Sequence, residues 1–279
     1  MIDNIRIVSH LQHLHLKQEL TQKRVWLGVL LGIGLAMLGG NGYLQYANDI
    51  NHPVQFLETY IVSANSFNKA IFQPLGWFLI ISDVPFIQKN DMLVIYRTNK
   101  KNWNTMIINY LIIMDIIYQS CIVISMCLIS LKQSYTGNIW SIPMQYIVQD
   151  QIGQTRYLYD IDFSYQLFIR NNHVYTAFVH TFLCNLLYDL ILGMFLYNVS
   201  FFMNKKYGIG LTVFLHFIEY ELLKEGYGLG VNSSLLGRSI AAFQFDAGNS
   251  TQIQNSYVVF MIVIVCLVSC SFKVIKKWI

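Results

Sequence analysis

The sequence predicts an all-α, polytopic membrane protein with six transmembrane helices, and three observations support this fold class. Of the 279 residues, 54% are hydrophobic and only 12% are charged, whereas soluble domains carry about 25% charged residues. Apolar runs long enough to cross a bilayer, about 17–25 residues, recur along the whole chain. The basic residues gather at the ends of these runs, as membrane topology requires.

Residues 1–23 precede the first apolar run and have a different pattern. Ile7, Leu11 and Leu14 follow helical spacing, with basic and histidine residues interleaved. This period is typical of an amphipathic helix that lies in the plane of the lipid headgroups. Because the pattern is short, a loosely ordered terminus is the alternative.

The predicted spans are recognised by their apolar length and by the residues at their ends. Trp26 opens the first span as an interfacial aromatic residue, and Lys205 and Lys206 are expected to end the fourth sharply. The chain is treated as a single transmembrane domain, residues 1–279. Its spans are predicted at residues 25–46, 70–88, 105–131, 174–203, 207–225 and 257–272.

Three connections between the spans carry further information. Residues 89–104 form a short basic loop, while residues 132–173 and 226–255 are longer and polar. Within the last of these, residues 235–245 are mildly apolar, which predicts short helices that dip into the outer interface. The tyrosines and Trp140 of the 132–173 segment predict that it is partly structured.

The distribution of positive charge predicts the orientation of the chain. Thirteen of the 19 Lys and Arg residues fall on the side of the termini and six on the other side. The positive-inside rule therefore puts both termini and the 89–104 loop in the cytosol, and the two long connections outside the cell. The chain is rich in Ile, Asn, Lys and Tyr and has only 4 Pro, which indicates an AT-rich bacterial genome and hence a bacterial plasma membrane.

Motifs for catalysis and for nucleotide or metal binding are not found in the sequence. It contains no GxxxxGK[ST] loop, no HExxH and no GxSxG. The 5 cysteines lie inside apolar runs, where they act as small hydrophobic residues. We therefore expect no catalytic residue, no metal and no cofactor in this chain, and a protein that is not an enzyme by itself. The net charge of +4 arises from the ends of the spans and predicts no nucleic-acid partner.

Acidic residues inside the predicted spans are the candidate intramembrane polar sites. Asp115 and Asp189 lie near the middle of the third and fourth spans, Asp83 near the end of the second, and Glu219 near the outer interface. A charge at the bilayer centre costs about 3 kcal/mol or more. One interpretation is a proton or cation relay. The other is polar packing with Asn and Tyr side chains at helical spacing.

The basic loop reads KNDMLVIYRTNKKNWN and contains the pattern Tyr-Arg-x-x-Lys-Lys-x-Trp, from Tyr96 to Trp103. It follows Asp83 and Pro85, and the chain ends in a lysine-rich tail. With the in-plane start and the six spans, this order of elements resembles the permease subunits of type-2 ABC exporters. The resemblance is notably to small permeases of Gram-positive bacteria that act in peptide or bacteriocin export and immunity.

The resemblance implies that residues 89–104 act as a coupling helix that docks onto a separate cytosolic ABC ATPase, which holds the ATP and Mg. It also implies a second permease, identical or a sister chain, beside this one in the lipid bilayer. An amphipathic substrate such as a peptide would pass along a path lined by the first, second and fifth spans. The alternative for the basic residues is that they are only stop-transfer charges. The residues expected to couple to the ATPase are Met92, Tyr96, Arg97, Lys100, Lys101 and Trp103.

A stand-alone, proton-coupled secondary transporter is the alternative function. It would use Asp115 and Asp189 to carry protons. Inverted repeats would support it, but residues 24–131 and 174–273 show no convincing similarity. Replacement of both acids by Asn separates the two hypotheses, because the ABC permease would keep partial activity and the proton-driven transporter none.

Overall fold

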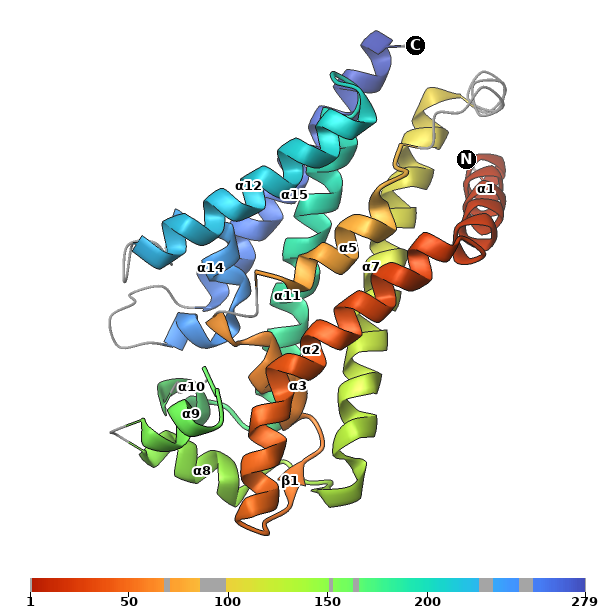
Figure 1. Cartoon of the computed structure of the whole chain (residues 1–279). Helices are drawn as coiled ribbons and strands as arrows, with labels where there is room; N and C mark the ends of the chain where they lie inside the picture. Colours follow the sequence, from red (N-terminus) through yellow and green to blue (C-terminus); the bar gives the residue numbers. More distant parts are fainter. Residues whose placement is uncertain are drawn as a thin grey trace.

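The computed structural model describes residues 2–67, 71–85, 99–150, 153–162, 166–225, 233–245 and 253–278, and these are mostly helical (Figure 1). The longer helices are α1 (Ile2–Leu20), α2 (Lys23–Asp49), α7 (Lys100–Ser130), α11 (Val174–Val199), α12 (Lys205–Glu225) and α15 (Ile253–Trp278). The shorter ones are α3 (Glu58–Ala64), α5 (Gln73–Ile81), α8 (Ile142–Gln149), α9 (Gln154–Leu158), α10 (Gln166–Asn171) and α14 (Leu235–Ser239), with the 3-10 turns η1 (Leu131–Gln133) and η2 (Ala241–Phe245).

Four helices in the described parts of the chain are long and apolar enough to cross a membrane. They correspond to the first, third, fourth and sixth predicted spans, and they indicate a membrane protein. Three of the four are longer than predicted, since α2 and α15 extend beyond the predicted spans at both ends and α7 begins at Lys100. Their bounds are Lys23–Asp49, Lys100–Gln133, Val174–Val199 and Ile253–Lys276.

The second predicted span differs from its expected form. In place of one helix over residues 70–88, α5 has 9 residues, about 13 Å of helix at 1.5 Å per residue. Pro74 lies in its first turn, where the missing N–H costs nothing. Residues 82–85 form a turn that ends it. The described part of this predicted span is therefore not one continuous helix, because Pro74 and turn residues bound α5 on both sides.

The fifth predicted span is helical, and α12 covers it from Lys205 to Glu225. Charged residues in its first turn and beyond Glu219 keep α12 from matching the apolar length of the other four. Lys205 and Lys206 begin this helix, whereas α11 already ends at Val199. The expectation that the two lysines end the fourth span is thus corrected, since residues 200–203 make that turn.

The ends of the helices show in which direction each helix runs. Near the start of α7, the Asn104 side chain accepts a hydrogen bond from the Tyr197 hydroxyl near the end of α11 (2.7 Å). The same side chain donates to the Ser271 hydroxyl near the end of α15 (3.0 Å). The starts of α2 and α12 and the end of α5 meet in the same way through Arg24, Lys205 and Asp83. Successive long elements therefore alternate in direction, and Figure 1 shows the two termini at the same end of the molecule.

The opposite end of the molecule holds the short elements of the 132–173 segment. Here α8, α9 and α10 lie beside the far end of α2 (Figure 1). Strand β1 (Val54–Gln55) pairs in parallel with β2 (Ser134–Tyr135), a small departure from the all-α prediction. The partial structure expected for the 132–173 segment is thus confirmed. In residues 235–245 the expected short helices are also present, as α14 and η2.

Helix α2 packs closely on α5 through glycines. A Cβ on Gly28 would lie 2.6 Å from the carbonyl oxygen of Gly76, and one on Gly32 would overlap the Tyr118 ring of α7. Small residues permit this approach of backbones, as in other helix pairs in membranes. This face of α2 is therefore buried in packing against α5 and α7.

Candidate functional site

Asp115 of α7 and Asp189 of α11 lie on helices that pack against each other, and Gln119, one helical turn beyond Asp115, donates to the Asp189 carboxyl group. Their exposed fractions are 0% and 2%. The two helices run in opposite directions, so residues near the middle of each meet. Two acidic groups predicted separately from the sequence therefore form one buried pair.

The Asp189 carboxyl belongs to a chain of side-chain amides. Gln119 Nε2 donates to Asp189 Oδ2 (2.7 Å), and Gln119 Oε1 accepts from Gln73 Nε2 (3.4 Å). On α5, the Trp77 indole N–H donates to the backbone carbonyl oxygen of Asp189 (2.7 Å). These contacts join α5, α7 and α11, and they give Asp189 a fixed hydrogen-bond donor.

The Asp115 carboxyl has a different environment. Both of its oxygens are buried, and neither has a hydrogen-bond partner among the residues that the structure describes. A buried polar group without a partner costs about 2–7 kcal/mol when neutral and far more when ionised. Such groups are rare in folded proteins and mark places where strain or a ligand has to be considered.

A second charged group lies at the end of the bundle where the helix ends meet. We call it the ion-pair junction, consisting of Glu19, Arg24, Asp83 and Lys205. Arg24 Nε lies 2.8 Å from Asp83 Oδ2, and the Arg24 guanidinium also contacts the Glu19 carboxylate. Lys205 at the start of α12 pairs with the other oxygen of Asp83. Burial raises the pKa of Glu19, and the neighbouring Arg24 opposes that rise.

The ion-pair junction changes the interpretation of Asp83. The sequence suggested an intramembrane polar residue, but Asp83 is about a third exposed and lies in the turn after α5. Two cations neutralise it, one from α2 and one from α12. Arg24 further donates to the Ile80 carbonyl oxygen and to the Ser82 hydroxyl, both at 3.0 Å. Asp83 therefore connects three helices at the end of the bundle.

Glu219 holds a short helix in place. Its carboxylate accepts from the Ser234 hydroxyl (2.7 Å) and from the backbone N–H of Leu236 (3.1 Å) at the start of α14. Ser234 in turn accepts from the Gly237 N–H, as a helix N-cap does. Glu219 is partly exposed. Its observed contacts thus fix α14 against α12.

The residues expected to couple to an ATPase are only partly described. Met92, Tyr96 and Arg97 lie outside the described residues. Lys100 and Lys101 form the first turn of α7, where Lys101 is exposed and Lys100 partly so. The structure therefore leaves these two lysines accessible to a partner or to lipid headgroups.

Trp103 has a different position from the one expected. Its side chain is fully buried, and its ring contacts His15 of α1 with centroids 5.4 Å apart. An aromatic residue that is buried within the chain presents no surface to a partner. The expectation that Trp103 docks onto an ATPase is corrected: in this structure it anchors α1 to the start of α7.

Some residues of these sites were not found from the sequence. Gln119 lies one helical turn beyond Asp115, a spacing that places both on one face of α7. Its place in the site could therefore have been predicted from the sequence. Trp77 donates to a backbone carbonyl oxygen on another helix, and no sequence pattern predicts such a contact. Glu19 and Arg24 are five residues apart at a helix break, which hides their pairing.

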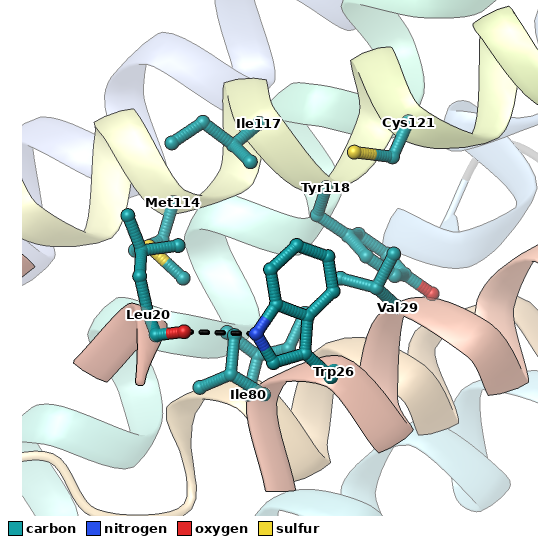
Figure 2. Close-up of a pocket in the computed structure, with 9 residues that line it drawn as sticks. Leu20, Trp26, Val29, Ile80, Met114, Ile117, Tyr118 and Cys121 are labelled. Carbon is teal, nitrogen blue, oxygen red and sulfur yellow. Dashed lines mark hydrogen bonds between the residues drawn. The ribbon is translucent and has the colours of Figure 1, made fainter. Parts of the chain in front are cut away.

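An apolar cavity lies between α2, α5 and α7 (Figure 2). Its volume is about 30 Å³, enough for only two or three waters, since one needs about 10–15 Å³. The Trp26 indole N–H that points toward it is bound to the Leu20 carbonyl oxygen (2.8 Å). The cavity therefore offers no polar group to a substrate. Over the described residues, no group of three or more His, Cys, Asp or Glu side chains lies together as a metal site would require.

Comparison with protein-family models, with curated proteins and with solved structures gives no match for this chain. Its function has to be inferred from the placement of its own side chains.

Proposed function

We propose that this chain is the membrane-spanning permease subunit of an ATP-driven ABC exporter in a bacterial plasma membrane. A separate cytosolic ATPase supplies ATP and Mg chemistry, and the chain works beside a second permease. The substrate is amphipathic, such as a peptide. Both termini and residues 89–104 lie on the cytosolic side in this proposal, in agreement with the excess of Lys and Arg there.

The alternation of helix direction supports six crossings. Helix α2 leads away from the ion-pair junction, and α7 starts again at the same end, so the chain returns through α5. In the same way α12 leads away from Lys205 before α15 returns. Residues 207–218 of α12 carry no Asp, Glu, Lys or Arg. The apolar part of α12 is thus compatible with the membrane interior, and its charged ends with the two interfaces.

The ion-pair junction is the observation that carries the proposal. Asp83 lies six residues before the segment expected to couple to the ATPase, and Lys100 opens α7 within that segment. Asp83 is bound to Arg24 of α2 and to Lys205 of α12. A displacement of residues 89–104 would therefore be transmitted directly to α7 and, through the ion pairs, to α2 and α12.

The proposed mechanism is alternating access. Closure of two ATPases would move the 89–104 segment of each permease and tilt the helices attached to the ion-pair junction. Exposed aromatic residues of α12, Phe214 (61%) and Phe217 (39%), present an apolar surface to the path. On α15, Val258, Met261 and Val265 are more than half exposed and face lipid or the second permease.

The test is co-purification with the ATPase after neutralisation of Lys100 and Lys101. The tagged chain with Lys100→Gln and Lys101→Gln is expected to retain about tenfold less ATPase than the unmodified chain, a difference of about 1.4 kcal/mol. The amount of a co-purified protein with a GxxxxGK[ST] motif is measured by mass spectrometry. The matched control replaces Lys132 and Arg170, two exposed cations at the other end of the molecule, by Gln.

Two results would contradict the proposal. In one, no such ATPase accompanies the unmodified chain from its native membrane. In the other, the Lys100/Lys101 pair and the control pair lose the ATPase to the same extent, which would show only a general effect of charge.

A proton-coupled secondary transporter is the second candidate, and the burial of Asp115 and Asp189 on helices joined by the Gln119 hydrogen bond is the observation that favours it. If protons alone drive transport, Asp115→Asn with Asp189→Asn abolishes it, and depletion of ATP at a maintained proton gradient has no effect. An ABC exporter stops when ATP is depleted and keeps partial transport in the double variant.

A further inference from the structure

Two buried carboxyl groups share the centre of the bundle, and neither takes part in the ion pairs that the described residues form. We propose that Asp115 and Asp189 form a proton-binding pair, in which Asp115 holds one proton at neutral pH while Asp189 carries the negative charge. Whether this pair binds a proton is independent of the ATP-driven function proposed above.

The pair cannot hold two negative charges without a compensating cation. Both side chains are removed from water, and like charges that share a dry site repel strongly. Buried acid pairs solve this conflict by keeping one proton. Within the described part of the chain, no Lys, Arg or His forms an ion pair with either carboxyl group.

The hydrogen bonds identify which carboxyl keeps the proton. The amide N–H of Gln119 donates to Asp189, and a donor of this kind stabilises an ionised carboxylate. Gln119 is itself oriented by the donor from Gln73. Asp115 receives no donor from any described residue. Its ionised form is therefore the less favourable of the two.

The elements packed around Asp115 contribute few titratable groups. Tyr60 of α3, Tyr118 of α7 and Asp189 of α11 interact with it electrostatically. Residues 25–48 of α2, all of α5 and residues 253–272 of α15 contain no Asp, Glu, Lys or Arg. Tyrosines remain neutral at physiological pH, so the charge state near Asp115 is set by the acid pair.

Release of the proton would change how α7 and α11 pack. The carboxylic acid of Asp115 would become a carboxylate, the proton would pass to water that reaches the pair, and two negative charges would then face each other. Repulsion between them favours separation of the helices or entry of water or a cation. Helix α7 begins within residues 89–104, the segment expected to couple to the ATPase. Release of the proton from Asp115 would therefore change the packing of the helix that begins in this segment.

Infrared difference spectroscopy of the purified full chain in lipid vesicles tests the proton directly. The unmodified chain is expected to show, at neutral pH, the C=O stretch of a protonated carboxyl that shifts in heavy water. Asp115→Asn should abolish that band, because an isosteric amide replaces the acid. Asp189→Asn should leave the band in place and move its frequency, since the neighbouring charge is lost.

The matched control is Asp49→Asn, whose carboxylate accepts from the Tyr159 hydroxyl at the far end of α2 (2.6 Å) and lies outside the pair. This variant should leave the band unchanged. A band that survives Asp115→Asn, or that disappears only in Asp189→Asn, overturns the assignment of the proton to Asp115. Thermal unfolding of each variant confirms that it is folded, and Asn at position 115 is expected to be tolerated because it resembles the neutral acid.

A second measurement uses the unmodified chain and needs no variant. Dicyclohexylcarbodiimide modifies protonated carboxyl groups in apolar surroundings, and peptide mass spectrometry locates the modified residue. Modification at Asp115 is expected at neutral pH and should decline at alkaline pH. Absence of modification would contradict the proposal, and so would protection by sodium chloride but not by choline chloride, which would identify a bound metal cation in place of the proton.

Discussion

Glu58 at the start of α3 shows how a single buried acid is held where donors surround it. Its exposed fraction is 0%. The carboxylate accepts from the Tyr43 hydroxyl (2.5 Å), the Gln55 N–H (3.1 Å), and both the N–H (2.7 Å) and hydroxyl (2.6 Å) of Ser141. Burial raises the pKa of Glu58, and the hydrogen bonds from Ser141 and Tyr43 oppose that rise. These contacts join α2, α3 and the start of α8.

We expect Glu58→Gln to destabilise the fold by about 1–3 kcal/mol, although the two side chains have the same shape. Two of the groups facing position 58 are backbone N–H donors, and the amide –NH₂ of glutamine would confront them with a third donor. Since the pKa of Glu58 is raised in the fold, its contribution to stability is largest below the unfolded value and declines as pH rises through the folded pKa. The difference between the two proteins should therefore shrink with rising pH.

Thermal unfolding in detergent, followed by circular dichroism between pH 4 and 8, measures this prediction. Glu221→Gln is the matched control, because Glu221 is exposed on α12 and the same change there should leave stability unaltered. Equal unfolding temperatures for Glu58→Gln and the unmodified chain at every pH would contradict the role assigned to the carboxylate.

The sequence predicted single functional residues only where they differ in polarity from the residues around them. Asp115 and Asp189 stand out because each is an acid in a long apolar run. Glu58 does not stand out in the sequence, since its donors come from residues 15 to 83 positions away or from the local backbone. The sequence carries the chemistry of a side chain, and contacts over such distances depend on the fold.

At the scale of helices, the length of an apolar run predicted the long helices reliably. The position at which a helix breaks was not predicted reliably. The four long helices follow from uninterrupted apolar runs. For α5, Pro74 and the acid and proline of residues 83–85 were visible in the sequence, but they did not indicate how short the helix between them is. Helix α2 is rich in glycine, and only the structure identifies α5 as the helix that packs closely against Gly28.

The contact between α2 and α5 predicts a strong difference between two glycines of the same helix. Gly28→Ala places a Cβ 2.6 Å from the Gly76 carbonyl oxygen, which forces the helices apart at a cost of about 1–3 kcal/mol. Gly34→Ala meets no atom within 4 Å, so it should be neutral or stabilise α2 by up to about 1 kcal/mol.

Unfolding temperatures of the two alanine variants, measured side by side in the same detergent, check this prediction. The pair is well matched because both changes add one methyl group to α2. If Gly34→Ala destabilises as much as Gly28→Ala, close contact with α5 is not what the glycine at position 28 provides.

At the scale of the whole molecule, two independent observations lead to the expectation that both termini lie on the same side of the membrane. One is the distribution of Lys and Arg in the sequence, and the other is the direction of the helices. The sequence predicted six crossings from apolar runs, while four helices have the required length in the described residues. Helices α5 and α12 are the exceptions. At the ion-pair junction α5 ends where α2 and α12 begin, so α5 runs opposite to both. Because α5 is short and α12 has charged ends, hydropathy alone does not identify them as membrane-spanning helices. The contacts between helices show the direction in which each of them runs.

The six-crossing arrangement predicts that the two ends of α12 lie on opposite sides of the membrane. Asn204 precedes α12 and Glu221 lies near its other end, and both are exposed. In a chain whose 5 cysteines are replaced by serine, Asn204→Cys should react with a membrane-impermeant maleimide only after the cells are permeabilised. Glu221→Cys should react in intact cells, as should Tyr157→Cys in α9, where the native side chain is 92% exposed.

The cysteine-free parent gives the background of labelling, and its yield after purification shows whether it folds. If Asn204→Cys and Glu221→Cys react on the same side, α12 lies along the membrane surface and the chain crosses fewer times. If Asn204→Cys reacts in intact cells and Tyr157→Cys does not, the six helices are arranged as proposed but inverted. The ion-pair junction would then lie outside the cell, beyond the reach of any cytosolic ATPase, so this one measurement also decides whether ATP can drive the chain in the way proposed.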